Sequence, residues 1–363
     1  MIGLAPRRRE LLAVGLLLGL SCSYPAASDA RPAPATTTST PTVTVGFWNV
    51  ANLFHPDETG PGQRSGLARI SPEKYERKLG GLARGLVLMG DGHPPEVVAL
   101  AEVGSDRALS DLVARPELEG AGYRAVRLDG PDGRGISNAV LTRLPLAASP
   151  EHHIVHAPGE RPTRAVLEVR MKLGATTLVV FANHWPSKRG GDVARAQREA
   201  IARRVVALVE AAVADDAEVL VLGDFNAYLD ERVFDGGYLN ASAVEADVRS
   251  GQARFFHTID DVAEAAWGRT IDDLDDVRTA EPARSFGTYV YRRRWGTLDG
   301  ILVHRGLLVD DGLAYVEDSA TIVRHRSLIY VVNRGRPDAY EKPDRDVSDH
   351  LPVTVEVRRV RAQ

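Results

Sequence analysis

Six short apolar segments of this chain end or begin in polar residues, and this recurrence limits the folds open to it. The segments are FWNVANLF (47–54), VVALAEV (97–103), VVFANHW (179–185), VLVLGDFN (219–226), TLDGILV (297–303) and SDHLPVTV (348–355). Short runs of apolar and β-branched residues bounded by turn residues predict buried β-strands. If these strands share a sheet edge, their polar residues meet along one rim. We therefore expect a sheet-rich fold with a polar site at its edge.

Helical patterns separate some of these strands. In SPEKYERKLGGLARGLVLMG, Ser71 is the expected N-cap and Pro72 the expected first helical residue. Residues 108–118 predict a second helix. In GDVARAQREAIARRVVALVEAAVADD, apolar residues such as Ile201 share one face, and Asp192 is the expected cap. Other strands follow one another without a helix, so we expect an α/β sandwich and not a doubly wound parallel sheet.

The first 22 residues predict an export signal. Three arginines precede a short apolar run and then small residues, and the run is shorter than the roughly 20 residues that span a bilayer. Cys22, the only cysteine, lies at the end of this signal. Two interpretations of it stay open: a lipid-modified N-terminus, or an incidental residue lost on cleavage. We expect an exported protein that is secreted, periplasmic or lipid-anchored at the cell surface.

A linker and one folded domain are expected after the signal. Residues 23–42 are rich in Ala, Pro, Ser and Thr, which predicts a flexible linker, and residues 43–360 carry the folded pattern. The formal net charge of −4 means that attraction to a polyanion must be local. Nothing in the sequence predicts a stable protein partner, so we expect a monomer that contacts a membrane only through a lipid on Cys22.

The expected rim is rich in groups that bind metals and transfer protons. Its four carboxylates are Glu102, Asp224, Asp299 and Asp349. Each has an ordinary explanation as a turn, cap or solvated residue, but gathered together they repel unless a cation lies between them. Oxygen ligands without cysteine suit Mg²⁺, Mn²⁺ or Ca²⁺. Two histidines, His184 and His350, suit proton transfer near neutral pH. This set fits metal-assisted attack of water on a phosphate ester.

Seven motifs in order resemble those of the endonuclease/exonuclease/phosphatase superfamily. They are WNVANL, LAEV, NAVLTR, NHW, GDFN, LDGILV and SDHLPV, and they span about residues 43–358. The longer forms NVANLF, NHWPSKRGG and GTYVYRRRWGTLDGILV look most like the secreted bacterial nuclease-like branch. The resemblance implies a four-layer αββα sandwich of the α/β (α+β) class. In it, two mostly antiparallel β-sheets lie face to face, helices cover their outer faces, and the site lies at one edge.

The resemblance also implies catalytic and metal-binding roles at the matching positions. The catalytic residues would be His184, Asp224, Asn226, Asp299 and His350. Asp224 would position or deprotonate the attacking water, Asn226 would hold a phosphate oxygen or the metal, and Asp299 would orient His350. Glu102 would be the principal Mg²⁺ ligand, with Asn49 beside it and Asp349 assisting.

Four further residues are candidates for contact with the substrate. Asn183 would support His184, and Lys188 and Arg189 would contact an anionic backbone, although a solvated charge pair is the ordinary interpretation. Arg164 would reach a phosphate, or would be a solvated arginine on an edge strand.

Three classes of function stay open. A metal-dependent nuclease acting on DNA or RNA is favoured by the complete motif set together with the export signal. A sphingomyelinase-like phospholipid phosphodiesterase or a phosphomonoesterase is the alternative. A sphingomyelinase is expected to carry an exposed aromatic hairpin, but three arginines interrupt the aromatics of residues 286–296, which fits a polyanion better. A non-catalytic surface-binding module is expected to have lost acids or histidines, and none of the main positions is vacant.

Overall fold

The computed structural model describes residues 42–62, 66, 69–156, 164–259, 261–262, 286–309, 312–336 and 339–360. The predicted export signal, Cys22 and residues 23–41 of the predicted linker lie outside these ranges. The first strand, β1, begins at Thr42, the last residue assigned to that linker. Within the described ranges, no helix is both long enough and apolar enough to cross a membrane.

The first of two large sheets is mostly antiparallel. Its strands are β1 (Thr42–Leu53), β2 (Val97–Val103), β3 (Arg124–Arg127), β4 (Ser137–Thr142), β14 (Leu313–Tyr315), β15 (Thr321–Ile322) and β18 (Val353–Arg359). They run in the order β14-β18-β1-β2-β4-β3, and β15 also pairs with β18. Among the described strands of this sheet, β1 and β2 alone pair in parallel. This pair joins the two strands that carry the WNVANL and LAEV motifs.

The second sheet joins the other motif-bearing strands. Its members are β5 (Glu151–His153), β6 (Val166–Leu173), β7 (Thr176–His184), β8 (Ala217–Asp224), β9 (Ala241–Ser242), β10 (Phe255–His257) and β13 (Asp299–His304). Their order is β5-β6-β7-β8-β13-β10-β9. Because β7 and β8 are parallel and β13 is antiparallel to β8, the end of β7, the end of β8 and the start of β13 lie at one edge.

Helices cover the outer faces of the sheets. They are α2 (Pro72–Met89), α3 (Asp106–Val113), α4 (Gly191–Ala214) and α5 (Glu245–Arg249), with short 3₁₀ helices at Pro116–Leu118, Lys188–Gly190, Arg232–Phe234 and Arg305–Leu308. The Ser71 hydroxyl accepts a hydrogen bond from the Lys74 amide, which confirms the predicted cap. The cap predicted at Asp192 is wrong. Helix α4 starts at Gly191, with φ +58°, so Asp192 already lies in its first turn, and the Asp192 carboxylate pairs with Arg195.

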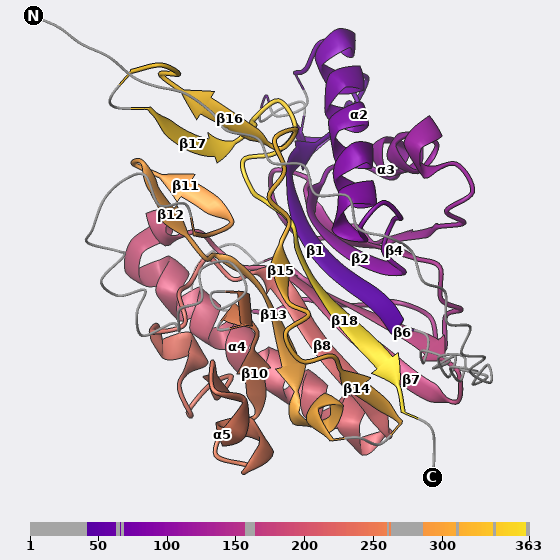
Figure 1. The fold of residues 1–363 in the computed structure, drawn as a ribbon, viewed down its shortest axis with the longest axis vertical. Coiled ribbons are helices and arrows are strands. Elements are labelled where there is room, and N and C mark those ends of the chain that lie inside the picture. The colour runs from indigo at the N-terminus through magenta and orange to yellow at the C-terminus, as the bar shows by residue number, and fades with distance from the viewer. Residues whose placement is uncertain are drawn as a thin grey trace, which may run out of the picture. The chain divides into compact units, whose positions relative to one another are not determined.

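Alternation along the strands produces the four layers. In β1, Val45 and Phe47 point into the core between the sheets, whereas Trp48 and Val50 pack under α2 and α3. Side chains of β7 and β8 divide in the same way between that central core and a second core under α4. Figure 1 shows α2 and α3 beside the first sheet and α4 beside the second. The predicted αββα sandwich is confirmed.

Two small hairpins extend from the sandwich. One consists of β11 (Tyr289–Tyr291) and β12 (Arg294–Gly296), and the other of β16 (Ile329–Val332) and β17 (Tyr340–Pro343). They lie next to each other in Figure 1, and β11 contacts β17. An isolated bridge pairs Tyr289 with His350. The hairpins therefore adjoin the strand ends that carry the predicted site.

Candidate active site

Strand register places three predicted residues in one row of the second sheet. His184 ends β7 opposite Asp224, which ends β8, and Asp224 is in turn opposite Asp299, the first residue of β13. Directly paired residues on neighbouring strands lie about 5 Å apart. All three are almost fully buried. Residues that lie far apart in the sequence thus become immediate neighbours.

The first sheet supplies the opposite side of the site. The Asn49 amide, from β1, donates a hydrogen bond of 3.0 Å to Asp224 Oδ2. From β2, Glu102 Oε1 lies 3.5 Å from His184 Nε2. Ser348, just before β18, donates to the Asn49 carbonyl oxygen at 2.5 Å and accepts from the His350 amide. The site is therefore built across the edge where the two sheets meet.

Asp299 and His350 form a buried charged pair. The Asp299 Oδ2 and His350 Nδ1 atoms are 2.7 Å apart. Burial alone would lower the pKa of His350, but the neighbouring carboxylate and its hydrogen bond outweigh burial and raise the pKa to about 10. The ring is thus a stable imidazolium whose Nε2 is left for a substrate. The sequence predicted this pair, and the structure brings the two residues together.

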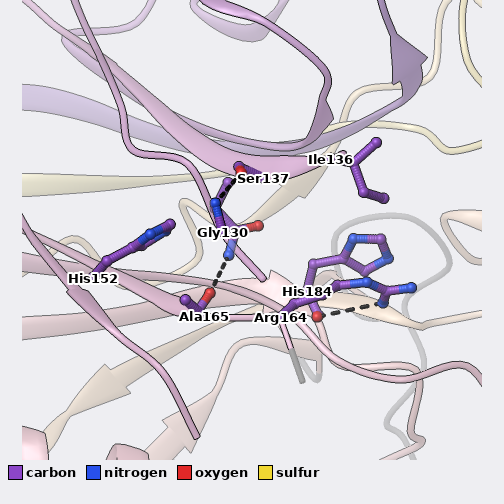
Figure 2. Close-up of a pocket in the computed structure, with 8 residues that line it drawn as sticks. Gly130, Ile136, Ser137, His152, Arg164, Ala165 and His184 are labelled. Atoms are coloured by element: carbon purple, nitrogen blue, oxygen red, sulfur yellow. Dashed lines mark hydrogen bonds between the residues drawn. The ribbon is translucent and has the colours of Figure 1, made fainter. Parts of the chain in front are cut away.

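His184 has the opposite electrostatic environment. Burial, and then the guanidinium groups of Arg164 and Arg134, hold its pKa well below the ordinary value. Figure 2 shows the Arg164 side chain beside the His184 ring, with a hydrogen bond to the His184 carbonyl oxygen. The neutral ring has Glu102 and Asp224 oxygens 3.5 Å from Nε2, so a proton on Nε2 would face both. The two histidines therefore divide into one charged and one neutral group.

Asp224 lies at the centre of the acidic rim. Its carboxylate accepts hydrogen bonds of 3.0 Å from the Asn49 side chain and from the Asn226 backbone amide. Burial, and then repulsion by Asp299, raise its pKa to about 7. Asn226 has a left-handed backbone, with φ +49°, and its side chain donates to the Trp185 carbonyl oxygen. Asp224 is consequently poised to gain or lose a proton near neutral pH.

The donor set at this rim fits a hard divalent cation. Asp224, Asp299 and His350 each place a ligand atom within 4.8 Å of the others, but Asp299 and His350 already bond to each other. Glu102 and Asp224 remain as carboxylate donors beside Asn49, whose side-chain oxygen accepts a hydrogen bond of 3.0 Å from the Ala51 amide. Glu102 adopts φ +65° inside a strand. This backbone conformation is energetically unfavourable for any residue other than glycine, and residues that adopt it cluster at functional sites. A cation here would relieve the carboxylate repulsion.

The predicted substrate contacts differ in their surroundings. Asn183 is buried, and its side chain donates to the Phe181 and Leu222 carbonyl oxygens and accepts from the Trp185 indole, so it supports the strand end that carries His184. Lys188 forms an ion pair with Glu231 and lies 3.5 Å over the Tyr228 ring. These partners were unforeseen because they follow Lys188 by about forty residues.

Two arginine positions and Asp349 complete the predicted set. Arg189 is exposed, in the turn between β7 and α4. Arg164 is not a solvated arginine: it donates to Asp132 Oδ2 at 2.9 Å and to the Trp185 carbonyl oxygen at 2.6 Å. Asp349 is partly exposed, with Oδ1 4.0 Å from His350 Nε2. Of these residues, Arg164 and Asp349 lie closest to the catalytic groups that the structure assembles.

Several residues of the site carried no clear signal in the sequence. Lys78, inside α2, is buried and donates to the Val347 carbonyl oxygen at 2.6 Å, and burial lowers its pKa to about 8 against the pull of the Asp349 and Glu102 carboxylates. Tyr289 stacks on His350 with ring centroids 4.7 Å apart. A lysine in a helix looks like a solvated residue, although the glycines beside it hint at close packing.

The comparisons with known proteins agree with this geometry. A family model, Endonuclease/Exonuclease/phosphatase family, matches residues 44–264, more than half of the chain. No curated protein matches the chain significantly. An endonuclease/exonuclease/phosphatase family protein from Bacteroides thetaiotaomicron has a similar structure, with a TM-score of 0.50, 15% identity, and coverage of 88% of this chain and 98% of that one.

Two further solved structures have the same degree of likeness. The human Nocturnin catalytic domain with bound sulfate anion has a TM-score of 0.50 and 15% identity, covering 88% of this chain and 94% of that one. A mannosyl-6-phosphatase from Bacteroides thetaiotaomicron has a TM-score of 0.50 and 15% identity, covering 87% of this chain and 99% of that one. At this identity these structures establish the fold alone.

The family match and the geometry complement each other. The matched range contains Asn49, Glu102, His184 and Asp224. Asp299 and His350 lie beyond it, and the fold brings both to the same rim. The chain belongs to the endonuclease/exonuclease/phosphatase family of phosphate-ester hydrolases.

Proposed function

We propose that this protein is a divalent-metal-dependent phosphodiesterase that hydrolyses nucleic acid. The observation that carries the proposal is the buried pair of Asp299 and His350, 2.7 Å apart, with the buried Asp224 carboxylate beside it. A fixed positive charge next to a group that titrates near neutral pH is suited to stabilising a phosphate that gains negative charge while water is deprotonated.

Metal binding falls to the oxygen donors of the rim. Glu102 would be the main ligand, with Asn49 beside it and Asp349 assisting, and the oxygen donors suit Mg²⁺, with Mn²⁺ or Ca²⁺ as alternatives. When bound, the ion supplies polarisation of a phosphate oxygen.

The chain's own residues carry the proton transfer and the charge. As the water oxygen bonds to phosphorus and the bond from phosphorus to the leaving sugar oxygen breaks, Asp224 accepts a proton from the water, and the leaving oxygen takes a proton from the solvent. The Asn226 amide and the Asn49 side chain fix the orientation of the Asp224 carboxylate. His350 donates from Nε2 to a non-bridging oxygen of the phosphate, while Asp299 retains the ring's orientation and charge. His184, neutral and rigidly placed, donates a hydrogen bond to a second oxygen.

The preference for a nucleic acid over a lipid or a phosphomonoester rests on the surroundings of the site. Arg292, Arg293 and Arg294 interrupt the aromatic residues of the adjoining hairpin, which favours a polyanion. The similar mannosyl-6-phosphatase structure keeps a phosphomonoesterase as the second candidate, although its 15% identity supports the fold alone. A substrate panel distinguishes these outcomes.

The panel compares plasmid DNA, single-stranded DNA, RNA, sphingomyelin and a sugar phosphate, each with Mg²⁺, Mn²⁺, Ca²⁺ or EDTA. We expect cleavage of nucleic acid with a divalent ion, loss of cleavage in EDTA, and loss in His350→Ala. The matched control is His93→Ala, which removes an exposed histidine that lies outside all seven motifs. Intact nucleic acids together with release of phosphocholine or free phosphate would replace the nuclease proposal by one of the other two.

We further propose that the protein is exported through residues 1–22. Fractionation of cells that produce the full chain, compared with cells that produce a chain lacking these residues, tests export. Labelling with a radioactive fatty acid in the full chain and in Cys22→Ala distinguishes lipidation from simple cleavage. Label in the full chain alone indicates a lipid anchor at Cys22.

A further inference from the structure

We propose that the two hairpins beside the active site bind a single-stranded segment of the nucleic acid next to the phosphate that is cleaved. The surface, called here the hairpin surface, consists of residues 289–296 and the strands β16 and β17. The inference rests on the proposed function, and it adds where the chain beyond the reacting phosphate binds and in what form. Four features carry it: the link to His350, the turn conformation, the rings and the charges.

The hairpin surface is continuous with the catalytic centre. Tyr289 pairs with His350 through a backbone bridge and stacks on its ring at 4.7 Å. The Leu351 amide donates to the Thr288 carbonyl oxygen at 2.7 Å, which fixes the base of the hairpin to the segment that carries His350. Strands advance about 3.3 Å per residue, so Tyr291 lies about 7 Å further from the centre than Tyr289. A single nucleic-acid strand that leaves the active site along β11 would therefore reach Tyr291 within one or two nucleotides.

The hairpin turn has an unusual sequence for its backbone. Arg292 and Arg293 connect β11 to β12 with φ +49° and +66°. Two-residue turns with both central residues left-handed strongly favour Asn-Gly because other residues are strained there. Two consecutive arginines therefore occupy positions that their backbone disfavours. Strain of this kind points to a function of the side chains.

Aromatic rings and cations alternate on the hairpin surface. Tyr291 and Tyr330 are 53% and 55% exposed, among the most exposed large hydrophobic side chains of the described residues. Arg292 lies 5.3 Å over the Tyr291 ring, and Lys342 lies 5.7 Å over the Tyr330 ring. Proteins that bind single-stranded nucleic acid combine cations for the phosphates with aromatic faces on which bases stack.

The charge distribution favours nucleic acid over a lipid bilayer. Residues 289–296 contain three arginines and no acidic residue. The tip of a membrane-docking hairpin is expected to insert apolar side chains among the lipids, but here the tip consists of Arg292 and Arg293. The exposed rings of Tyr291 and Tyr330 can stack on unpaired bases, whereas the bases of a duplex already stack on one another and are not open to these rings. The partner of this surface is therefore a single strand.

The test replaces the turn by the sequence its backbone prefers. Arg292→Asn with Arg293→Gly removes two cations and relieves the strain, so the melting temperature should stay the same or rise. Binding of a fluorescent single strand of about 12 nucleotides, measured by anisotropy in EDTA, should weaken about tenfold. The slope of the logarithm of the binding constant against the logarithm of the salt concentration should become less steep by about 1.4. Each of the two lost phosphate contacts accounts for about 0.7 of this change.

Two other variants make the result specific. Tyr291→Ala should weaken binding of the single strand about tenfold and leave binding of a duplex of the same sequence the same. Arg203→Gln with Arg204→Gln removes the same charge from the exposed face of α4 and should leave binding of the single strand unchanged.

Three outcomes would overturn the inference. The turn variant could bind the single strand as the unaltered protein does, the α4 control could lose as much affinity as the turn variant, or the turn arginines could mediate binding to phosphatidylserine vesicles and not to the oligonucleotide. Cleavage of the oligonucleotide by the unaltered protein with Mg²⁺ is read separately. If the protein cleaves the oligonucleotide but the hairpin variants bind it normally, this inference alone is contradicted. If binding depends on the hairpin but no cleavage occurs, the proposed function alone is contradicted.

Discussion

Asp299 and His350 meet across the two sheets of the sandwich. Asp299 opens β13 of the second sheet and His350 precedes β18 of the first, yet the carboxylate and Nδ1 are 2.7 Å apart and both residues are buried. The Trp48 indole additionally donates to the His350 carbonyl oxygen at 2.9 Å. The pair therefore depends on the correct packing of both sheets.

Replacing Asp299 by asparagine tests the role of its charge. The amide has the same shape but cannot hold His350 as an imidazolium, so Asp299→Asn should lower kcat at least about a hundredfold with a smaller effect on KM. Steady-state kinetics on a short oligonucleotide measures this effect. Asp318→Asn is the matched control, because Asp318 is exposed and its φ of +59° suits asparagine equally. An equal loss in both variants would argue against a special role for Asp299.

Metal binding should appear as thermal stabilisation. An ion that binds only the folded protein stabilises it by about 2.7 kcal/mol at a hundred times its Kd, so Mg²⁺ should raise the melting temperature. In Glu102→Gln the main ligand is weakened while the carboxylate repulsion is relieved. We expect this variant to melt at the same or a higher temperature in EDTA and to respond little to Mg²⁺. A full response of the variant to Mg²⁺ would place the ion elsewhere.

Two adjacent glycines of α2 should respond differently to the same substitution. A Cβ on Gly81 would lie 2.5 Å from a methyl of Val347, in the segment that leads to His350. A Cβ on Gly80 would meet the ends of flexible side chains, the nearest being Arg84 at 3.2 Å. Gly80→Ala should stabilise the protein by about 0.5–1 kcal/mol. Gly81→Ala should destabilise it by about 1–3 kcal/mol through overpacking and should also reduce kcat. Urea unfolding together with kinetics checks both, and equal behaviour of the two variants would contradict the close approach.

Acid should destabilise the protein partly through His257. Burial lowers the pKa of this ring to about 4 from 6.5, so between these values the unfolded chain binds more protons than the folded one. The stability present above pH 6.5 is therefore lost as the pH falls toward 4, by about 3 kcal/mol in total. His257→Phe should show a smaller loss between these pH values in urea unfolding. An unchanged pH dependence in His257→Phe would mean that other groups dominate.

The strand ends were predictable from the sequence because their chemistry is local. Buried runs that stop at His184 and Asp224, and one that starts at Asp299, follow a pattern that is visible without any partner. The αββα layers followed from alternation and from the resemblance of the motifs to a known family.

The partners of the surrounding side chains were not predictable in the same way. Arg164 looked like a solvated residue, but the loop that carries Asp132 covers it. Lys188 looked available to a substrate, but Glu231 pairs with it. Such pairings depend on how loops that are distant in the sequence fold against each other, and the hydrophobic periodicity of the sequence does not predict those contacts.

The central claim is that water attacks a phosphodiester at this rim, and isotope incorporation tests it most directly. An oligonucleotide is cleaved in ¹⁸O-labelled water with Mg²⁺, and the phosphate end groups are analysed by mass spectrometry. The account predicts one labelled oxygen at each new phosphate end, and no product in EDTA or with Asp224→Asn. Intact oligonucleotide, or cleavage without the label, would contradict it.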